Sequence, residues 1–199
     1  DLSIFAVPHG ALVAAERPAL RPDGPERYQV MVLHGEVEGV FPGDRTSVEY
    51  GGALLAPSEL AAGEWSYVAL GHYHIQHEVA PRVWYAGALD YVSSNCWGEL
   101  RDEAEHRVSG KGWLLVDLAT GAVERQPVAP VRRVLDLPAI AGAGLAASAL
   151  DELIATRVGD VPGGIADQVV RLVVRDVPRH VARDLDHTAI RAFKAEALH

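Results

Sequence analysis

The sequence predicts a mixed α/β (α+β) fold. Several short apolar runs each end at a glycine or a histidine, which is typical of strands in a parallel sheet. The last third of the chain alternates strand and helix patterns instead, as in a small α/β unit. The composition, with 49% hydrophobic and 23% charged residues, is that of an ordinary globular protein.

The first part of the chain reads mainly as strands. They are predicted at 4–7, 28–33, 67–70 and 83–86, and a hairpin is predicted from 112–118 and 122–128. The runs at 28–33 and 67–70 are almost continuously apolar, so we expect both faces of each to be buried. Residues 36–56 and 93–110 lack a sustained period and are interpreted as loops, and Ser58 begins a short helix.

A composition shift near residue 130 divides the chain into predicted domains 1–130 and 131–199. The first holds 9 Lys and Arg against 18 Asp and Glu, and the second holds 9 of each. The predicted elements of the second are a strand at 134–137, a helix at 145–157, a strand at 168–175 and a helix at 186–198. The excess of acidic residues in the first part argues against non-specific binding of nucleic acid, unless divalent cations supply positive charge locally.

The sequence favours a cytoplasmic protein without a membrane segment. No apolar run approaches the roughly 20 residues that span a bilayer. The first residues do not combine a basic stretch with an apolar one, so they do not resemble a secretory signal. The single Cys96 excludes an internal disulfide and fits a reducing compartment.

Three of the nine histidines stand where predicted strands end. His34 follows the strand at 28–33, and His72 and His74 follow the strand at 67–70. In open α/β sheets, binding sites form beyond the carboxyl ends of strands, where the loops converge. Neutral imidazole is a common ligand of zinc-, manganese- and iron-type ions. We therefore interpret His34, His72 and His74 as candidate metal ligands.

The spacing of these residues leaves a second interpretation open. An isolated His-x-His is more often part of a polar loop, and His77 continues the same stretch. A two-metal phosphoesterase site also needs carboxylates, one of which bridges ions about 3.5–4 Å apart. The nearby acids, Glu36, Glu38, Glu78 and Asp90, do not form Asp-x-His or Gly-Asp arrangements at strand ends. The residues alone therefore predict half of a metal site.

Five segments share an order that is familiar from one enzyme family. They are VLHG at 32–35, YVALGHYH at 67–74, VWYAGAL at 83–89, KGWLLVDL at 111–118 and VVRLVV at 169–174. This order resembles the second half of a calcineurin-like metallophosphoesterase, and more narrowly the DNA repair exonuclease branch, the SbcD/Mre-type nucleases. The resemblance covers nearly the whole chain, although Ala88 replaces the serine usual after Gly87.

The resemblance implies a fold, a cofactor and partners. The fold is the C-terminal half of a metallophosphoesterase β-sandwich flanked by helices, at 1–130, with a small α/β capping domain that binds DNA, at 131–199. His34 and His72 resemble ligands of one ion and His74 a ligand of the other, with Mn²⁺ as the usual metal. The implied function is phosphodiester hydrolysis as a DNA exonuclease or endonuclease in double-strand break repair. DNA is the implied substrate, a SbcC/Rad-type ATPase the implied partner, and a homodimer the implied assembly.

The family's earlier ligand motifs are missing. Asp-x-His and Gly-Asn-His do not occur, so we expect this chain to be the C-terminal portion of such an enzyme, without the N-terminal metal-ligand motifs. Two alternatives follow. The chain is a non-catalytic fragment or partner-binding module, or it belongs to a metallophosphoesterase that acts on small nucleotides or phospholipid head groups.

Basic side chains outside the histidine segments are candidates for DNA contact. The candidates are Arg101, Arg107, Lys111, Arg171 and Arg175. The first three lie in or beside the predicted loop 93–110, where acidic residues are interspersed and a solvated loop is the competing interpretation. Arg171 and Arg175 share one face of a predicted strand, because i and i+4 point to the same side.

Overall fold

The structure is a computed structural model of the 199-residue chain, and it describes residues 1–41 and 53–198. The chain divides into two compact units, Asp1–Pro130 and Val131–His199. Both units combine helices with strands, which confirms the predicted mixed α/β class. Every helix in the described ranges is too short or too polar to span a bilayer.

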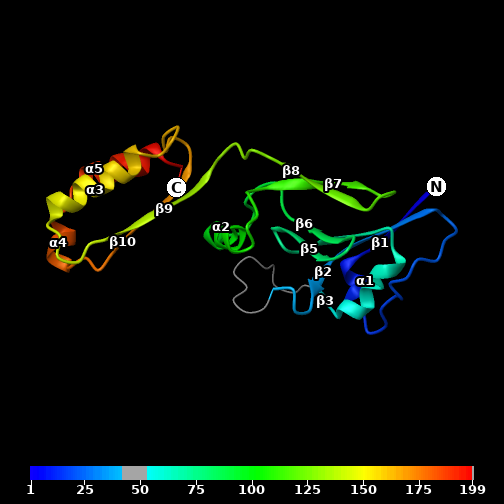
Figure 1. Ribbon diagram of the computed structural model, residues 1–199. Coiled ribbons are helices and arrows are strands. Elements are labelled where there is room, and N and C mark those ends of the chain that lie inside the picture. The colour runs from blue at the N-terminus through cyan, green and yellow to red at the C-terminus, as the bar shows by residue number, and fades with distance from the viewer. Residues whose placement is uncertain (42–52, 199) are drawn as a thin grey trace. The chain divides into compact units, whose positions relative to one another are not determined.

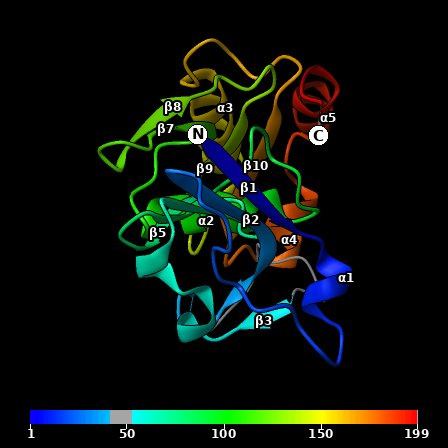
Figure 2. The same cartoon turned by 90° about the vertical axis from the view of Figure 1, so that its right-hand side faces the viewer.

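The first unit is built on a six-stranded sheet, drawn in Figure 1. Its strands are β1 (Leu2–Val7), β2 (Tyr28–Val37), β3 (Ala53–Leu55), β4 (Tyr67–Gly71), β5 (Gln76–Ala80) and β6 (Val83–Ala86). The order is β1-β2-β4-β6-β5, and β3 pairs with the end of β2. All pairs are parallel except β5 with β6. Figure 2 shows β1 alongside β2, where Leu2 pairs with Tyr28 and Val7 with Leu33.

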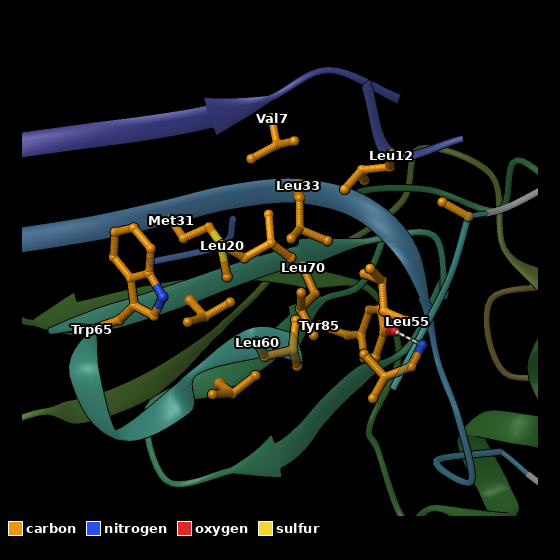
Figure 3. Close-up of a cluster of buried hydrophobic side chains, with 14 of the residues drawn as sticks. Val7, Leu12, Leu20, Met31, Leu33, Leu55, Leu60, Trp65, Leu70 and Tyr85 are labelled. Atoms are coloured by element: carbon orange, nitrogen blue, oxygen red, sulfur yellow. Dashed lines mark hydrogen bonds between the residues drawn. The ribbon is translucent and has the colours of Figure 1, made fainter. Parts of the chain in front are cut away.

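The core of the first unit lies on one face of this sheet (Figure 3). Met31 and Leu33 of β2 and Leu70 of β4 are at most 3% exposed. Helix α1 (His9–Leu12) and the short 3-10 turns η1 (Pro57–Leu60) and η2 (Ala62–Glu64) lie on the same side, since Leu12 and Leu60 belong to this cluster and Ala62 packs against it. The predicted helix at Ser58 is therefore only one turn long.

Tyr85 of β6 ties the middle of the sheet to the end of β2. Its ring is fully buried, and its hydroxyl donates to the Gly35 carbonyl and accepts from the Val37 N–H, both at 2.9 Å. Figure 3 shows the second bond as a dashed line. These bonds satisfy a polar group that would otherwise be costly in the core, and they fix the backbone just after His34.

The opposite face of the sheet is partly open. Val32 is 40% exposed and Ile4 is 61% exposed, although neighbouring residues of the same strands are buried. The prediction that strands 28–33 and 67–70 are buried on both faces is therefore wrong for β2. The reason is that α1, η1 and η2 all cover one face, so alternate residues of β1 and β2 face outward.

Two other predictions for the first unit are wrong, and one strand was not predicted. The segment 36–56 is not simply a loop, because β2 continues to Val37 and β3 lies within it, while residues 42–52 fall outside the described residues. The segment 93–110 contains helix α2 (Cys96–Glu105), which Asn95 caps by accepting the Gly98 N–H at 3.2 Å. Strand β5 was not predicted. The hairpin is confirmed, as β7 (Gly112–Asp117) and β8 (Ala122–Pro127).

The second unit is a two-stranded parallel sheet with three helices. Its elements are β9 (Val134–Ala141), α3 (Ala147–Gly159), β10 (Val169–Arg175), α4 (Arg179–Arg183) and α5 (His187–Glu196). The predicted strand-helix-strand-helix order is confirmed, with α4 as an addition. A small core centres on Ile140, Leu150, Ile154 and Val181. Asp186 caps α5 by accepting the N–H groups of Thr188 and Ala189, both at 2.9 Å.

Candidate functional site

His34 and His72 are brought together by the register of β2 and β4. The two strands are parallel, and His34 pairs with Gly71, the last residue of β4. His72 therefore follows directly beside His34, with ring centroids 5.4 Å apart and the rings nearly perpendicular. His34 is exposed and His72 is 3% exposed, so the pair runs from the surface into the molecule.

Gly71 makes room for this arrangement. A Cβ atom at this position would lie 2.9 Å from His34 Nδ1, closer than side-chain atoms normally approach. The absence of a side chain thus lets the His34 ring lie across the end of β4. The pairing of β2 with β4 therefore brings Gly71 and His72 beside His34, although the two histidines are far apart in the chain.

The backbone of His72 is in an unusual conformation. Its φ of +122° lies in a region that side-chain-bearing residues rarely adopt. Such a conformation costs on the order of 1–3 kcal/mol and persists only where the surroundings hold it. Here it turns the chain sharply after β4. Strain of this kind clusters at functional sites, which makes His72 the most informative residue of the segment.

Two substitutions at position 72 test this strain. Both His72→Ala and His72→Gly remove the same ring, so their difference in stability isolates the backbone. At an ordinary position glycine is less stable than alanine by about 0.5–1 kcal/mol. At a positive φ we expect the reverse, with His72→Gly more stable by about 1 kcal/mol. Urea unfolding followed by tryptophan fluorescence measures this, and a more stable alanine variant would contradict the conformation.

His74 is held by a carboxylate that the sequence did not single out. Its Nδ1 lies 3.2 Å from Oε1 of Glu99, which is fully buried on α2. The same oxygen accepts the Ser93 N–H at 2.8 Å, and the other contacts the Lys111 ammonium. His74 is itself largely buried, with 11% of its side chain exposed.

The charge on Glu99 follows from these contacts. Burial alone would raise the pKa of its carboxyl. Hydrogen bonds from His74, Lys111 and the Ser93 N–H outweigh that effect, so the pKa lies below its usual range. Glu99 is therefore ionised at neutral pH, and it acts purely as an acceptor toward the groups around it.

The donor set suits a metal ion only in part. His34 and His72 provide two neighbouring imidazole nitrogen donors at one edge of the sheet, a combination that manganese- and zinc-type ions accept. Within residues 1–41 and 53–198, however, no three His, Cys, Asp or Glu side chains gather closely enough to hold an ion. Glu36 is buried and Glu38, Glu78 and Asp90 are exposed, and in the described part of the chain none of these acids joins His34 and His72 in such a group.

His77 belongs to a different cluster. It lies on β5, with its ring 4.8 Å from that of Phe41 and 5.4 Å from that of His106. Burial lowers the pKa of His77, and the nearby His106 and Arg125 lower it further. This packing makes His77 an ordinary half-buried aromatic neighbour rather than an extension of the His72–His74 segment.

The candidates for DNA contact in the first unit differ in their exposure to solvent. Lys111 is only 2% exposed, with its ammonium between Glu99 and Glu103, so its interpretation as a phosphate contact is wrong. Arg101 is exposed on α2 beside Asp102 and Glu105, and Arg107 is exposed just after that helix.

In the second unit, Arg171 Nε donates to Asp136 Oδ1 at 2.8 Å, while Arg175 is exposed at the end of β10. Asp136 is thus a direct competitor for any phosphate that would approach Arg171. The hydrogen bond from Arg171 lowers the pKa of Asp136, so this acid is ionised at neutral pH. The two arginines share a strand, as predicted, and their contact with DNA stays a prediction.

No protein-family model matches the sequence, and no curated protein resembles it significantly.

Proposed function

We propose that this chain supplies histidine ligands to a metal-dependent phosphodiesterase that acts on DNA. The observation that carries the proposal is the packing of the His34 ring, from the second half of β2, against a strained His72 directly beyond the carboxyl end of β4. Parallel sheets commonly place reactive sites at this edge. The order of segments from 32 to 118, which resembles that of metallophosphoesterases, supports the same chemistry.

A bound divalent ion such as Mn²⁺ would supply charge neutralisation at the phosphoryl oxygens and an activated water. His34 and His72 would hold one ion, and His74 would approach a second. Because the described residues do not gather a complete ligand set, carboxylates from outside them have to complete the site. The acidic balance of residues 1–130 fits this proposal, since metal ions would then provide the positive charge that a phosphodiester requires.

Hydrolysis of bis-p-nitrophenyl phosphate with Mn²⁺ tests the proposal. We expect His72→Ala to lower the rate about 100-fold, since misplacing a reacting group by 1 Å can already cost that much. His9→Ala, an exposed histidine on α1, is the matched control and should retain the wild-type rate. Equal rates for the wild type and His72→Ala would remove the proposal.

One observation favours a second candidate, a non-catalytic module. The described residues bring two histidines together but no third ligand. A chain that never binds a metal pair would serve by packing against a partner instead. A Mn²⁺ titration separates the two candidates, because two tightly bound ions per chain exclude the non-catalytic module.

A further inference from the structure

A buried polar network lies behind His74. Glu99 is fully buried, and Lys111 and Glu103 are 2% and 5% exposed. The Lys111 ammonium contacts Glu99, lies 2.9 Å from Glu103 Oε1, and donates to the His74 carbonyl at 3.2 Å. Tyr91 completes the network, with its hydroxyl donating to Glu103 at 2.9 Å and its ring 4.4 Å from the ammonium.

The presence of such a network does not by itself mean that it stabilises the fold. Replacing buried ion pairs by well-packed apolar residues is often neutral or stabilising, because removing charges from water is costly. Here two carboxylates from α2 and the ammonium of Lys111, the residue just before β7, converge at one end of the His72–His74 segment. Only one of the two carboxylates, Glu99, touches a histidine ring.

We propose that Glu99 is a positioning residue that holds His74 for metal binding. It accepts the Nδ1–H of His74, which places the electron pair of the neutral ring on Nε2. Lys111 and the Ser93 N–H hold the Glu99 carboxylate in place, so that the ring direction is set by a buried group. Metal-binding histidines commonly donate their other nitrogen to a carboxylate in this way. The role of Nε2 as a ligand rests on the proposed function.

The carboxamide variant Glu99→Gln tests the role of Glu99. Lys111 is only a donor and is charged, so its demand for an acceptor outweighs that of the Ser93 N–H; the single amide oxygen of glutamine turns toward Lys111, the amide NH₂ turns toward His74, and the Ser93 N–H loses its acceptor. Nδ1 must then accept, and the ring proton moves to Nε2. Glu103→Gln is the matched control, because it removes the same charge beside Lys111 without touching His74.

Two measurements on the full 199-residue chain decide the proposal. Long-range ¹H–¹⁵N spectra at pH 8 report which nitrogen of His74 carries the proton, with the His74→Gln variant assigning the signals. We expect Nδ1–H in the wild type and in Glu103→Gln, and Nε2–H in Glu99→Gln. Titration with Co²⁺ should show affinity about 10–100-fold weaker for Glu99→Gln and close to wild type for Glu103→Gln.

The outcomes separate the two ideas. A wild-type His74 protonated at Nε2, or Glu99→Gln spectra identical to those of the wild type, would overturn the role of Glu99. Since the wild-type spectrum alone is informative, the test does not depend on a variant that folds. If the tautomers behave as expected but the wild type binds no Co²⁺, Glu99 still orients His74, and it is the proposed metal-dependent function that fails.

Discussion

Replacing Lys111 by methionine is expected to lower the free energy of unfolding by about 3–5 kcal/mol, which is the usual cost of removing one partner from a buried ion pair. Methionine fills a similar volume but leaves Glu99 and Glu103 facing each other without a cation. Both carboxylates are at most 5% exposed, so water cannot replace the ammonium. The Nζ contact with the His74 carbonyl is lost as well.

Urea unfolding measured by tryptophan fluorescence gives this value for the first unit alone, because all four tryptophans lie in residues 1–130. Arg21→Met is the control, since the pair of Arg21 with Glu64 is exposed and should contribute no more than about 1 kcal/mol. Combining Lys111→Met with Glu99→Gln and Glu103→Gln should recover part of the loss. If Lys111→Met were as stable as Arg21→Met, water would be able to replace the ammonium, and the network would be hydrated rather than dry.

The sequence was most informative where apolar runs end at histidines. The runs 28–33 and 67–70 became β2 and β4, because continuous apolar residues of this length are typical of parallel strands. The position of His72 directly after β4 was therefore predictable, whereas the prediction that His34 follows its strand is wrong, because β2 continues to Val37 and pairs there with β3. The proximity of His34 and His72 was not predictable, since it depends on β2 and β4 being neighbours in the register that pairs His34 with Gly71, and no short turn between the two strands indicates that pairing.

Helix α2 was missed for a physical reason. Its buried face carries Gly98, Glu99 and Glu103, so the residues that face inward are polar. An amphipathic helix is recognised by apolar residues at helical spacing, and here carboxylates around Lys111 replace them. The spacing of Glu99 and Glu103, four residues apart, was the available signal. It indicates a shared helix face, but not that this face is buried.

The proposed metal site marks a different limit of sequence-based prediction. The histidines could be proposed from strand ends, yet the described residues place only His34 and His72 ring against ring, while His74 turns toward Glu99. Sequence spacing assigned the three side chains to one site. In the fold, His74 has different neighbours from His34 and His72, because the positive φ of His72 turns the chain before it reaches His74.

Adding one methyl group at Gly71 is expected to impair function far more than stability. The new Cβ atom would lie 2.9 Å from His34 Nδ1 and 3.7 Å from two ring carbons, so the ring has to move. His34 is exposed, so the displacement of its ring does not open the core, and we expect a cost in unfolding free energy of about 1 kcal/mol. The pairing with His72 would be lost.

We expect Gly71→Ala to reduce Mn²⁺-dependent hydrolysis of bis-p-nitrophenyl phosphate about 100-fold, because a ligand displaced by about 1 Å no longer meets the reacting centre. Gly63→Ala is the control, since nothing lies within 4 Å of the added atom. In a His34→Ala background, Gly71→Ala should have no further effect, because the displaced ring is already absent. A further loss in that background would mean that Gly71 acts on the backbone of His72 rather than on His34.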